Sequence, residues 1–239
     1  FIPFWIFNGF SMSTTPRVID ALASHAKVMS IRSDQIDLIP SEITSDLAVP
    51  ENLSLINAPL VWDRGWMGQG VVVATMDTGV DVSHPDLLEN WRGGSNSWFD
   101  PFGRHDVPSD MNGHGTMTMG VILGRNKSGT SIGVAPEAKW IAVKIFDDDD
   151  SSTATAVHLG FQWLLDPDSE PETDDAPHVV NNSWSFAQPG CNTEFLLDIQ
   201  ALYAAGILPI FSAGNFGPED TTSVSPANYP EAFAVGAVN

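Results

Sequence analysis

The chain has 239 residues, enough to bury one substantial core with a small unit appended to it. Its 30 acidic and 10 basic residues give a formal charge of −20, and such a surface repels nucleic acids and anionic membranes, so neither is expected as a partner. The single cysteine excludes an intrachain disulfide, and the spacing of the histidines is not that of a zinc site. No apolar run approaches the ~20 residues of a membrane helix. We expect a globular protein that is a monomer.

The first 40 residues indicate a small β-α-β unit. Residues 4–12 are typical of a strand, a Thr-Thr-Pro sequence then begins a helix in the usual way, and residues 27–31 predict a second strand. Such a unit is too small for a core of its own, so we expect residues 1–40 to pack on the larger C-terminal part of the chain. The chain begins at Phe1 without the cationic flank of a signal peptide, and we expect that its true start is missing.

Residues 41–56 are polar and rich in turn formers and indicate a linker, and from residue 57 onward strand and helix patterns alternate. Short β-branched runs predict strands at residues 71–76, 140–146, 179–183, 207–212 and 233–238. Apolar or amphipathic stretches predict helices at residues 58–62, 114–123, 151–165 and 193–205. This alternation predicts a doubly wound, mostly parallel α/β sheet with helices on both faces.

Asp77 comes at the end of the predicted strand 71–76, and the Thr-Gly pair after it can turn the chain sharply. In open α/β sheets, ligands bind outside the carboxyl ends of the strands. A carboxylate at this position contributes little to core packing but can contact a bound ligand. An ordinary turn aspartate is the alternative explanation.

Two further polar residues occupy comparable positions. His114 lies between two glycines at a predicted helix start, where the helix dipole disfavours an imidazolium unless a carboxylate such as Asp77 lies nearby. An Asp-His pair of this kind is two-thirds of a nucleophilic triad. Asn215 follows another buried strand, and its amide can donate a hydrogen bond to an oxyanion. A helix cap and a turn former are the alternatives for these two residues.

Taken together, several short motifs of this chain resemble those of the subtilisin-like serine proteases, and they occur in that family's order. They are Met76-Asp77-Thr78-Gly79-Val80-Asp81, His84-Pro85-Asp86-Leu87, Asn112-Gly113-His114-Gly115-Thr116, Gly133-Val134-Ala135-Pro136, Ser183-Trp184-Ser185 and Ala213-Gly214-Asn215. The resemblance covers residues 57–239 and identifies them as the N-terminal part of a catalytic domain. It implies a serine endopeptidase that uses an Asp-His-Ser triad on polypeptide substrates.

The resemblance also implies roles for individual residues. Asp77 would orient the imidazole, His114 would act as general base and then as acid, and Asn215 would donate to the oxyanion. The substrate backbone and first side-chain pocket would be flanked by Ser183, Trp184, Ser185, Ser212, Ala213 and Gly214. Residues 1–40 are similar to the back half of the family's inhibitory pro-segment, which would be a partner of the cleft, and an extracellular location is implied by the same likeness. An unrelated N-terminal extension is the alternative.

The match breaks at the nucleophile. The family's Gly-Thr-Ser-Met-Ala stretch, which comes after the asparagine, does not occur in these 239 residues. Ser131 lies in a Gly-Thr-Ser-Ile sequence, but it precedes Asn215 where the family has a surface loop, and we do not assign it as the nucleophile. We therefore expect the parent protein to be a protease and this chain alone to be inactive. A peptide-binding pseudoprotease is the alternative.

No cofactor is required by this chemistry. Asp81 is a candidate calcium ligand, but Lys127 stands where relatives have an asparagine ligand, which argues against the metal. Residues 147–150 are four consecutive aspartates, which are either a solvated acidic loop or a source of preference for basic substrate residues. An aspartic protease would need a second Asp-Thr-Gly or Asp-Ser-Gly and an all-β fold, and the sequence supports neither.

Overall fold

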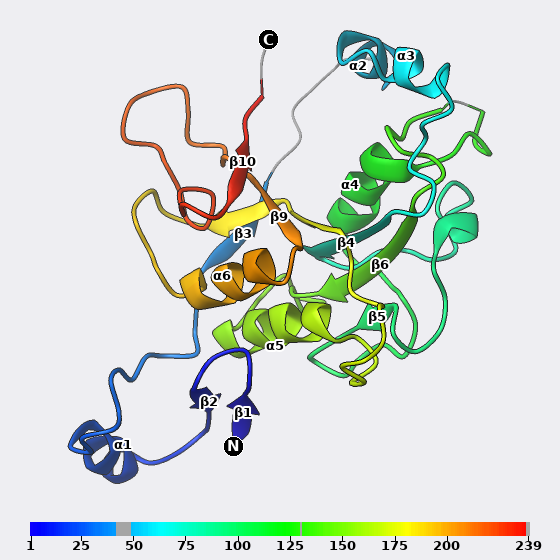
Figure 1. Ribbon diagram of the computed structural model, residues 1–239. Helices are drawn as coiled ribbons and strands as arrows, with labels where there is room; N and C mark the ends of the chain where they lie inside the picture. The colour runs from blue at the N-terminus through cyan, green and yellow to red at the C-terminus, as the bar shows by residue number, and fades with distance from the viewer. Residues whose placement is uncertain (42–48, 130, 238–239) are drawn as a thin grey trace.

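The computed structural model describes residues 1–41, 49–129 and 131–237 (Figure 1). Its centre is a six-stranded sheet in which every neighbouring pair is parallel, with strand order β10-β9-β7-β4-β6-β5. The strands are β4 (Val72–Asp77), β5 (Trp98–Phe99), β6 (Lys139–Lys144), β7 (Val179–Asn182), β9 (Leu208–Ser212) and β10 (Phe233–Val235). The predicted α/β class and parallel sheet are confirmed.

Helices cover both faces of this sheet because the inner strands are apolar on both sides. Along β4, Ala74 and Met76 pack into one core cluster together with helices α5 (Ala154–Leu165) and α6 (Leu196–Ala204). The neighbouring Val73 packs into a second cluster together with α4 (His114–Leu123). This alternation is the two-residue period of a strand, and it places the two helix layers on opposite faces (Figure 1).

The N-terminal unit differs from the prediction. In place of one strand over residues 4–12, β1 (Ile2–Phe4) and β2 (Gly9–Ser11) form an antiparallel hairpin. Asn8 ends its turn and Gly9 begins β2, and the Gly9 amide donates to the Phe7 carbonyl at 2.9 Å. The helix α1 (Pro16–Ala23) begins at the proline, as predicted.

The strand predicted for residues 27–31 is wrong, and the unit is therefore not β-α-β. Met29 is fully exposed there, and within the described residues no strand lies beside the segment to bond its backbone groups. The strand forms further along, as β3 (Leu38–Pro40), which pairs antiparallel with β8 (Trp184–Phe186). Neither strand of this pair was predicted.

Within the predicted linker 41–56, residues 42–48 lie outside the described part of the structure, and α2 (Val49–Leu55) is helical. The helix α3 (Ala58–Trp62) comes next, as predicted. A short 3₁₀ helix, η1 (Leu88–Asn90), lies between β4 and β5. In the described residues, no helix combines the length and the apolar character needed to cross a membrane.

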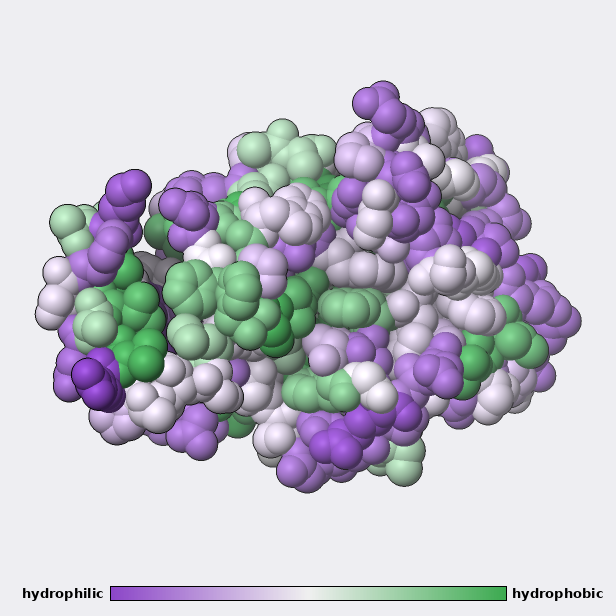
Figure 2. Space-filling view, turned by 90° about the horizontal axis from the view of Figure 1, so that it is seen from below, coloured by the Kyte–Doolittle hydropathy of each residue, from purple (hydrophilic) through white to green (hydrophobic). Residues whose placement is uncertain are grey.

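The N-terminal unit packs on the larger C-terminal part of the chain, and its contacts are made to α5 and to the segment before α6. The Trp5 amide donates to Gln162 Oε1 of α5 at 2.7 Å, and Asp34 Oδ1 accepts from the Thr155 amide in the first turn of that helix at 2.7 Å. Arg32 pairs with Glu194, which precedes α6, at 2.5 Å. Apolar side chains remain exposed on the unit, notably Phe1 and Trp5, and apolar patches are visible on the face that carries it (Figure 2).

Candidate active site

Asp77 and His114 are in direct contact. Asp77 is the last residue of β4 and fully buried, and its Oδ1 lies 2.7 Å from Nδ1 of His114, the first residue of α4. The same Oδ1 accepts the Thr78 amide at 2.7 Å, whereas Oδ2 has no hydrogen-bond partner within the described chain. The contact that we expected from sequence is therefore present, although the catalytic roles of the two residues stay predictions.

Glycines allow the strand end and the helix start to approach this closely. A Cβ added to Gly115 would lie 2.0 Å from the Gly79 carbonyl oxygen and 3.2 Å from Asp77 Oδ1. A Cβ added to Gly79 would lie 2.0 Å from the Ser109 carbonyl oxygen, and the φ of Gly79 is +113°. The Thr-Gly and His-Gly pairs of the sequence are thus the condition for the contact between Asp77 and His114.

The surroundings of His114 favour its charged form. Burial by itself lowers the pKa of the imidazole, but the hydrogen bond and the negative charge of Asp77 outweigh burial and raise the pKa above its ordinary value of 6.5. Burial raises the pKa of the Asp77 carboxyl, while the hydrogen bond and charge of His114 act in the opposite direction. The Asp77 carboxyl thus holds the ring on one side.

The other side of the ring meets a segment of the same chain. His114 Nε2 lies 2.8 Å from the Ser41 carbonyl oxygen. The Ser41 amide donates to the Ser183 carbonyl at 2.7 Å, and the hydroxyls of Ser41 and Ser212 lie 2.5 Å apart. Sequence reasoning did not single out Ser41; the only signal was the polar stretch that begins there after an Ile-Pro pair.

The register of the sheet explains why these residues converge. Thr75 of β4 pairs with Asn181 of β7, which pairs with Ile210 of β9. Two residues further along each parallel strand come Asp77, Ser183 and Ser212, so all three stand at one level of the carboxyl edge. The site predicted from sequence thus lies at the edge where parallel sheets bind ligands.

The other predicted substrate residues have different environments. The Trp184 ring is fully buried against the aromatic rings of Phe195 and Phe211, so only its backbone, which pairs with Pro40, is available to a peptide. Ser185 pairs with Ile39 and is also buried.

The segment after β9 completes the predicted set. The Ala213 amide bonds the Val235 carbonyl at 2.8 Å, and Gly214 has φ +89°. Asn215 is exposed and makes no hydrogen bond within the described chain. Its amide is therefore free to bind a group from outside.

We expected Lys127 to compete with a calcium ion for Asp81, but the two side chains have different partners in the structure. Asp81 Oδ1 accepts from the Ser83 amide at 2.8 Å and from its hydroxyl at 2.7 Å. Lys127 pairs with Glu89 at 3.0 Å. These contacts do not test whether Asp81 binds calcium, and we assign no metal ion to this region.

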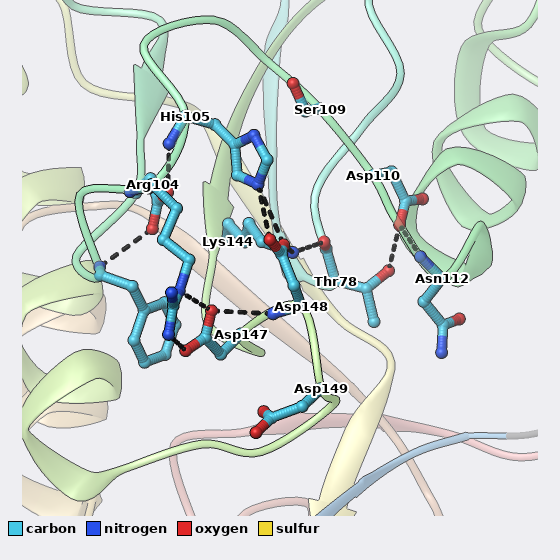
Figure 3. A network of polar contacts seen from close by, with 12 residues as sticks. Thr78, Arg104, His105, Ser109, Asp110, Asn112, Lys144, Asp147, Asp148 and Asp149 are labelled. Carbon is cyan, nitrogen blue, oxygen red and sulfur yellow. Dashed lines mark hydrogen bonds and ion pairs between the residues drawn. The ribbon is translucent and has the colours of Figure 1, made fainter.

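The four consecutive aspartates mostly bind partners of this chain (Figure 3). Asp147 pairs with Arg104 at 2.5 Å, and Asp148 with His105 at 2.9 Å. Asp148 also lies 3.3 Å from Nζ of Lys144, a buried cation at the end of β6 that donates to the Thr78 carbonyl at 2.8 Å. These internal pairs favour a structural acidic loop over a subsite for basic substrate residues.

Comparisons with known proteins agree with this arrangement. The model of the family described as Peptidase_S8, the subtilase family, matches residues 68–239. The chain is similar to Bacillopeptidase F of Bacillus subtilis (strain 168), with 41% identity over 206 residues, covering 79% of this chain and 14% of that protein. Two other relatives from the same strain are 34% identical: Major intracellular serine protease, covering 86% of this chain and 64% of the relative, and Subtilisin E, covering 80% and 47%. The chain thus spans less than two thirds of the length of each of these relatives.

Proposed function

This chain belongs to the subtilase family, and on that premise we propose that the protein containing it is a serine endopeptidase. The observation that carries the proposal is the buried contact of 2.7 Å between Asp77 and His114 at the carboxyl edge of the sheet. A carboxylate on Nδ1 fixes the tautomer of the imidazole and stabilises its charged form, and Nε2 is then the atom that exchanges a proton with a serine hydroxyl. The relative named Major intracellular serine protease supports the same chemistry.

The nucleophile is a serine outside these 239 residues, because the family's nucleophile motif is absent from them. In the complete protein, His114 takes the proton of that serine as it attacks the peptide carbonyl and then gives it to the leaving amine. Asn215 donates its amide hydrogen to the oxyanion that forms. Its exposed position after β9, with no hydrogen bond in the described chain, supports this role.

Extended polypeptides are the proposed substrates, recognised through their backbone. Support comes from β3, which already lies antiparallel on β8, with the Ser41 amide bonded to the Ser183 carbonyl at 2.7 Å. A substrate strand that adopts the same register gains the same backbone hydrogen bonds whatever its side chains are. Residues 183–185 and 212–214 thus flank the bound chain.

The N-terminal residues act, in this proposal, as an inhibitory pro-segment. They dock on α5, and the Ser41 carbonyl lies on His114 Nε2, where a substrate carbonyl would lie close to the reacting groups. We propose that cleavage near Ser41 frees the cleft. A monomeric protein acting outside the cell remains the proposed context, although one relative is named an intracellular protease.

A direct assay tests the proposal. The complete protein is expected to hydrolyse a chromogenic peptide and to lose that activity with a serine-directed inhibitor, whereas residues 1–239 alone show no turnover. Inhibitor-sensitive hydrolysis by residues 1–239 would overturn the assignment of the nucleophile. Peptide binding without hydrolysis by the complete protein would favour the pseudoprotease.

A further inference from the structure

Asp110 is the most heavily hydrogen-bonded side chain beside the Asp77 and His114 pair, and the proposed mechanism gives it no role. It lies three residues before Gly113, the N-cap residue of α4 (Figure 3). Its Oδ1 accepts from Thr78 Oγ1 at 2.9 Å, from the Asn112 amide at 3.1 Å and from the Gly113 amide at 2.8 Å. Its Oδ2 accepts from the amide and the hydroxyl of Thr116 at 2.9 and 2.6 Å.

These bonds replace a cap that α4 lacks. Glycine at the N-cap has no side chain, so the first amides of the helix need acceptors from elsewhere. Asp110 takes the amides of Gly113 and Thr116, and its charge also suits the positive end of the helix dipole. The Asp110 carboxylate therefore binds two amides at the start of α4, while Asn112 Oδ1 and Thr78 Oγ1 accept those of His114 and Gly115.

The same carboxylate is tied to the strand that carries Asp77. Thr78 donates its hydroxyl hydrogen to Asp110 and accepts the Gly115 amide on the same oxygen at 2.9 Å. The Thr78 amide in turn donates to Asp77 Oδ1, the atom that His114 contacts. A backbone bridge between Gly79 and Asp110 runs alongside. Asp110 and Thr78 thus link the two halves of the pair through hydrogen bonds at each step.

We propose that Asp110 is a positioning residue that fixes the His114 imidazole against Asp77 by clamping the start of α4 to Thr78. The proposal rests on the proposed function of the pair, but it concerns a residue that touches neither the substrate nor the ring. All five donors point into the carboxylate, so both oxygens are occupied and the group is not available as a metal ligand.

The chemistry of the clamp predicts which substitutions break it. In Asp110→Asn, the amide nitrogen that replaces one oxygen faces N–H donors and cannot accept from them. In Asp110→Glu, the charge is kept but the carboxylate is displaced by one methylene group. In Thr78→Val, the hydroxyl link is lost while the shape of the side chain is kept. A matched control is Asp100→Asn, since Asp100 also accepts three backbone amides (those of Phe102, Arg104 and His105) but contacts neither half of the pair.

The test is nuclear magnetic resonance of the Nδ1–H proton of His114 in the 239-residue chain, assigned by its loss in His114→Gln. In the wild type and in Asp100→Asn, the proton is expected to give a downfield, slowly exchanging signal. In Asp110→Asn, Asp110→Glu and Thr78→Val, its exchange with water is expected to be ~10-fold faster or the signal to vanish, because the hydrogen bond to Asp77 is no longer held in line. The glutamate variant separates positioning from charge.

The outcomes are distinguishable. A wild-type signal in both Asp110→Glu and Thr78→Val overturns the positioning role, and a change in Asp110→Asn alone would assign its effect to charge. If Asp110→Asn fails to fold, Thr78→Val and Asp110→Glu still decide the matter. If Asp77→Asn leaves the signal intact, the pair itself fails, and with it the proposed function. In the complete enzyme, the Asp110 variants are expected to lose about 10²-fold in kcat with a smaller change in KM, as for a misplacement of about 1 Å.

Discussion

The Ser41 carbonyl oxygen lies 2.8 Å from His114 Nε2, on the side of the imidazole opposite Asp77. Both ring nitrogens therefore face oxygen acceptors, and both can be satisfied only if each nitrogen carries a hydrogen. This arrangement favours the imidazolium, which is the direction in which the charge of Asp77 and the Ser41 carbonyl also shift the pKa of His114. An imidazolium cannot act as a general base, so this contact would add to the inhibition that we propose for the N-terminal residues.

Replacing Asp77 is expected to reverse the pKa shift of His114. In Asp77→Asn the charge that raises the pKa is gone, while burial, which lowers it, remains. The pKa should therefore fall below its wild-type value, so the imidazolium loses its proton at a lower pH. A titration followed by nuclear magnetic resonance of the histidine rings measures this. An unchanged His114 titration would refute the electrostatic role of Asp77.

The contact of Ser41 can be tested with a pair of substitutions. Ser41→Pro removes the amide that donates to the Ser183 carbonyl, whereas Ser41→Ala keeps the amide and removes only the hydroxyl. Because the Ser41 carbonyl helps to raise the pKa of His114, we expect a lower His114 pKa in the proline variant than in the alanine variant. Each lost hydrogen bond costs about 1 kcal/mol. Equal titrations in the two variants would show that the segment is not held through Ser183.

We expect the protein to lose stability at alkaline pH because His158 then loses its proton. Burial by itself lowers the pKa of this α5 residue, but its hydrogen bonds to Asp198 and Glu194 raise the pKa to about 9. Since the folded-state value lies above the unfolded value of 6.5, the stabilisation is complete below pH 6.5 and is lost as pH rises through about 9. This contribution to the free energy of unfolding is about 3 kcal/mol. Urea unfolding at pH 6 and pH 10 measures it, and the pH difference should shrink in His158→Gln.

Two glycines of α4 offer a matched comparison of packing. In Gly115→Ala the new Cβ would lie 2.0 Å from the Gly79 carbonyl oxygen, so we expect a loss of about 1–3 kcal/mol in the free energy of unfolding. In Gly120→Ala the nearest atom, Ile132 Cδ1, is 3.4 Å away, and the better helix propensity of alanine should leave stability within about 1 kcal/mol of the wild type. Equal effects in urea unfolding would contradict the close approach of α4 to β4.

The sequence predicted the parts of the site that depend on local signals. A buried β-branched run ending in Asp77 and a helix beginning at His114 placed both residues at strand and helix ends, and their contact was expected from the parallel sheet. The pairing of β3 with β8 joins residues about 145 positions apart and leaves no local trace. The prediction of a strand at residues 27–31 was wrong for a related reason. A strand forms only beside a second strand, and residue propensities do not show whether one is present. Asp110 was missed because a carboxylate before a glycine N-cap also suits an ordinary loop.

Peptide hydrolysis by the complete protein, with Asp77→Asn or His114→Ala introduced, shows directly whether these two residues carry out the proposed chemistry. If the two residues are the aspartate and histidine of a serine endopeptidase triad, His114→Ala is expected to lower kcat about 10⁶-fold, the loss known for subtilisin. Asp77→Asn is expected to lower kcat about 10⁴-fold. Asp100→Asn should retain the wild-type rate. Hydrolysis that persists at the wild-type rate in His114→Ala would contradict the account.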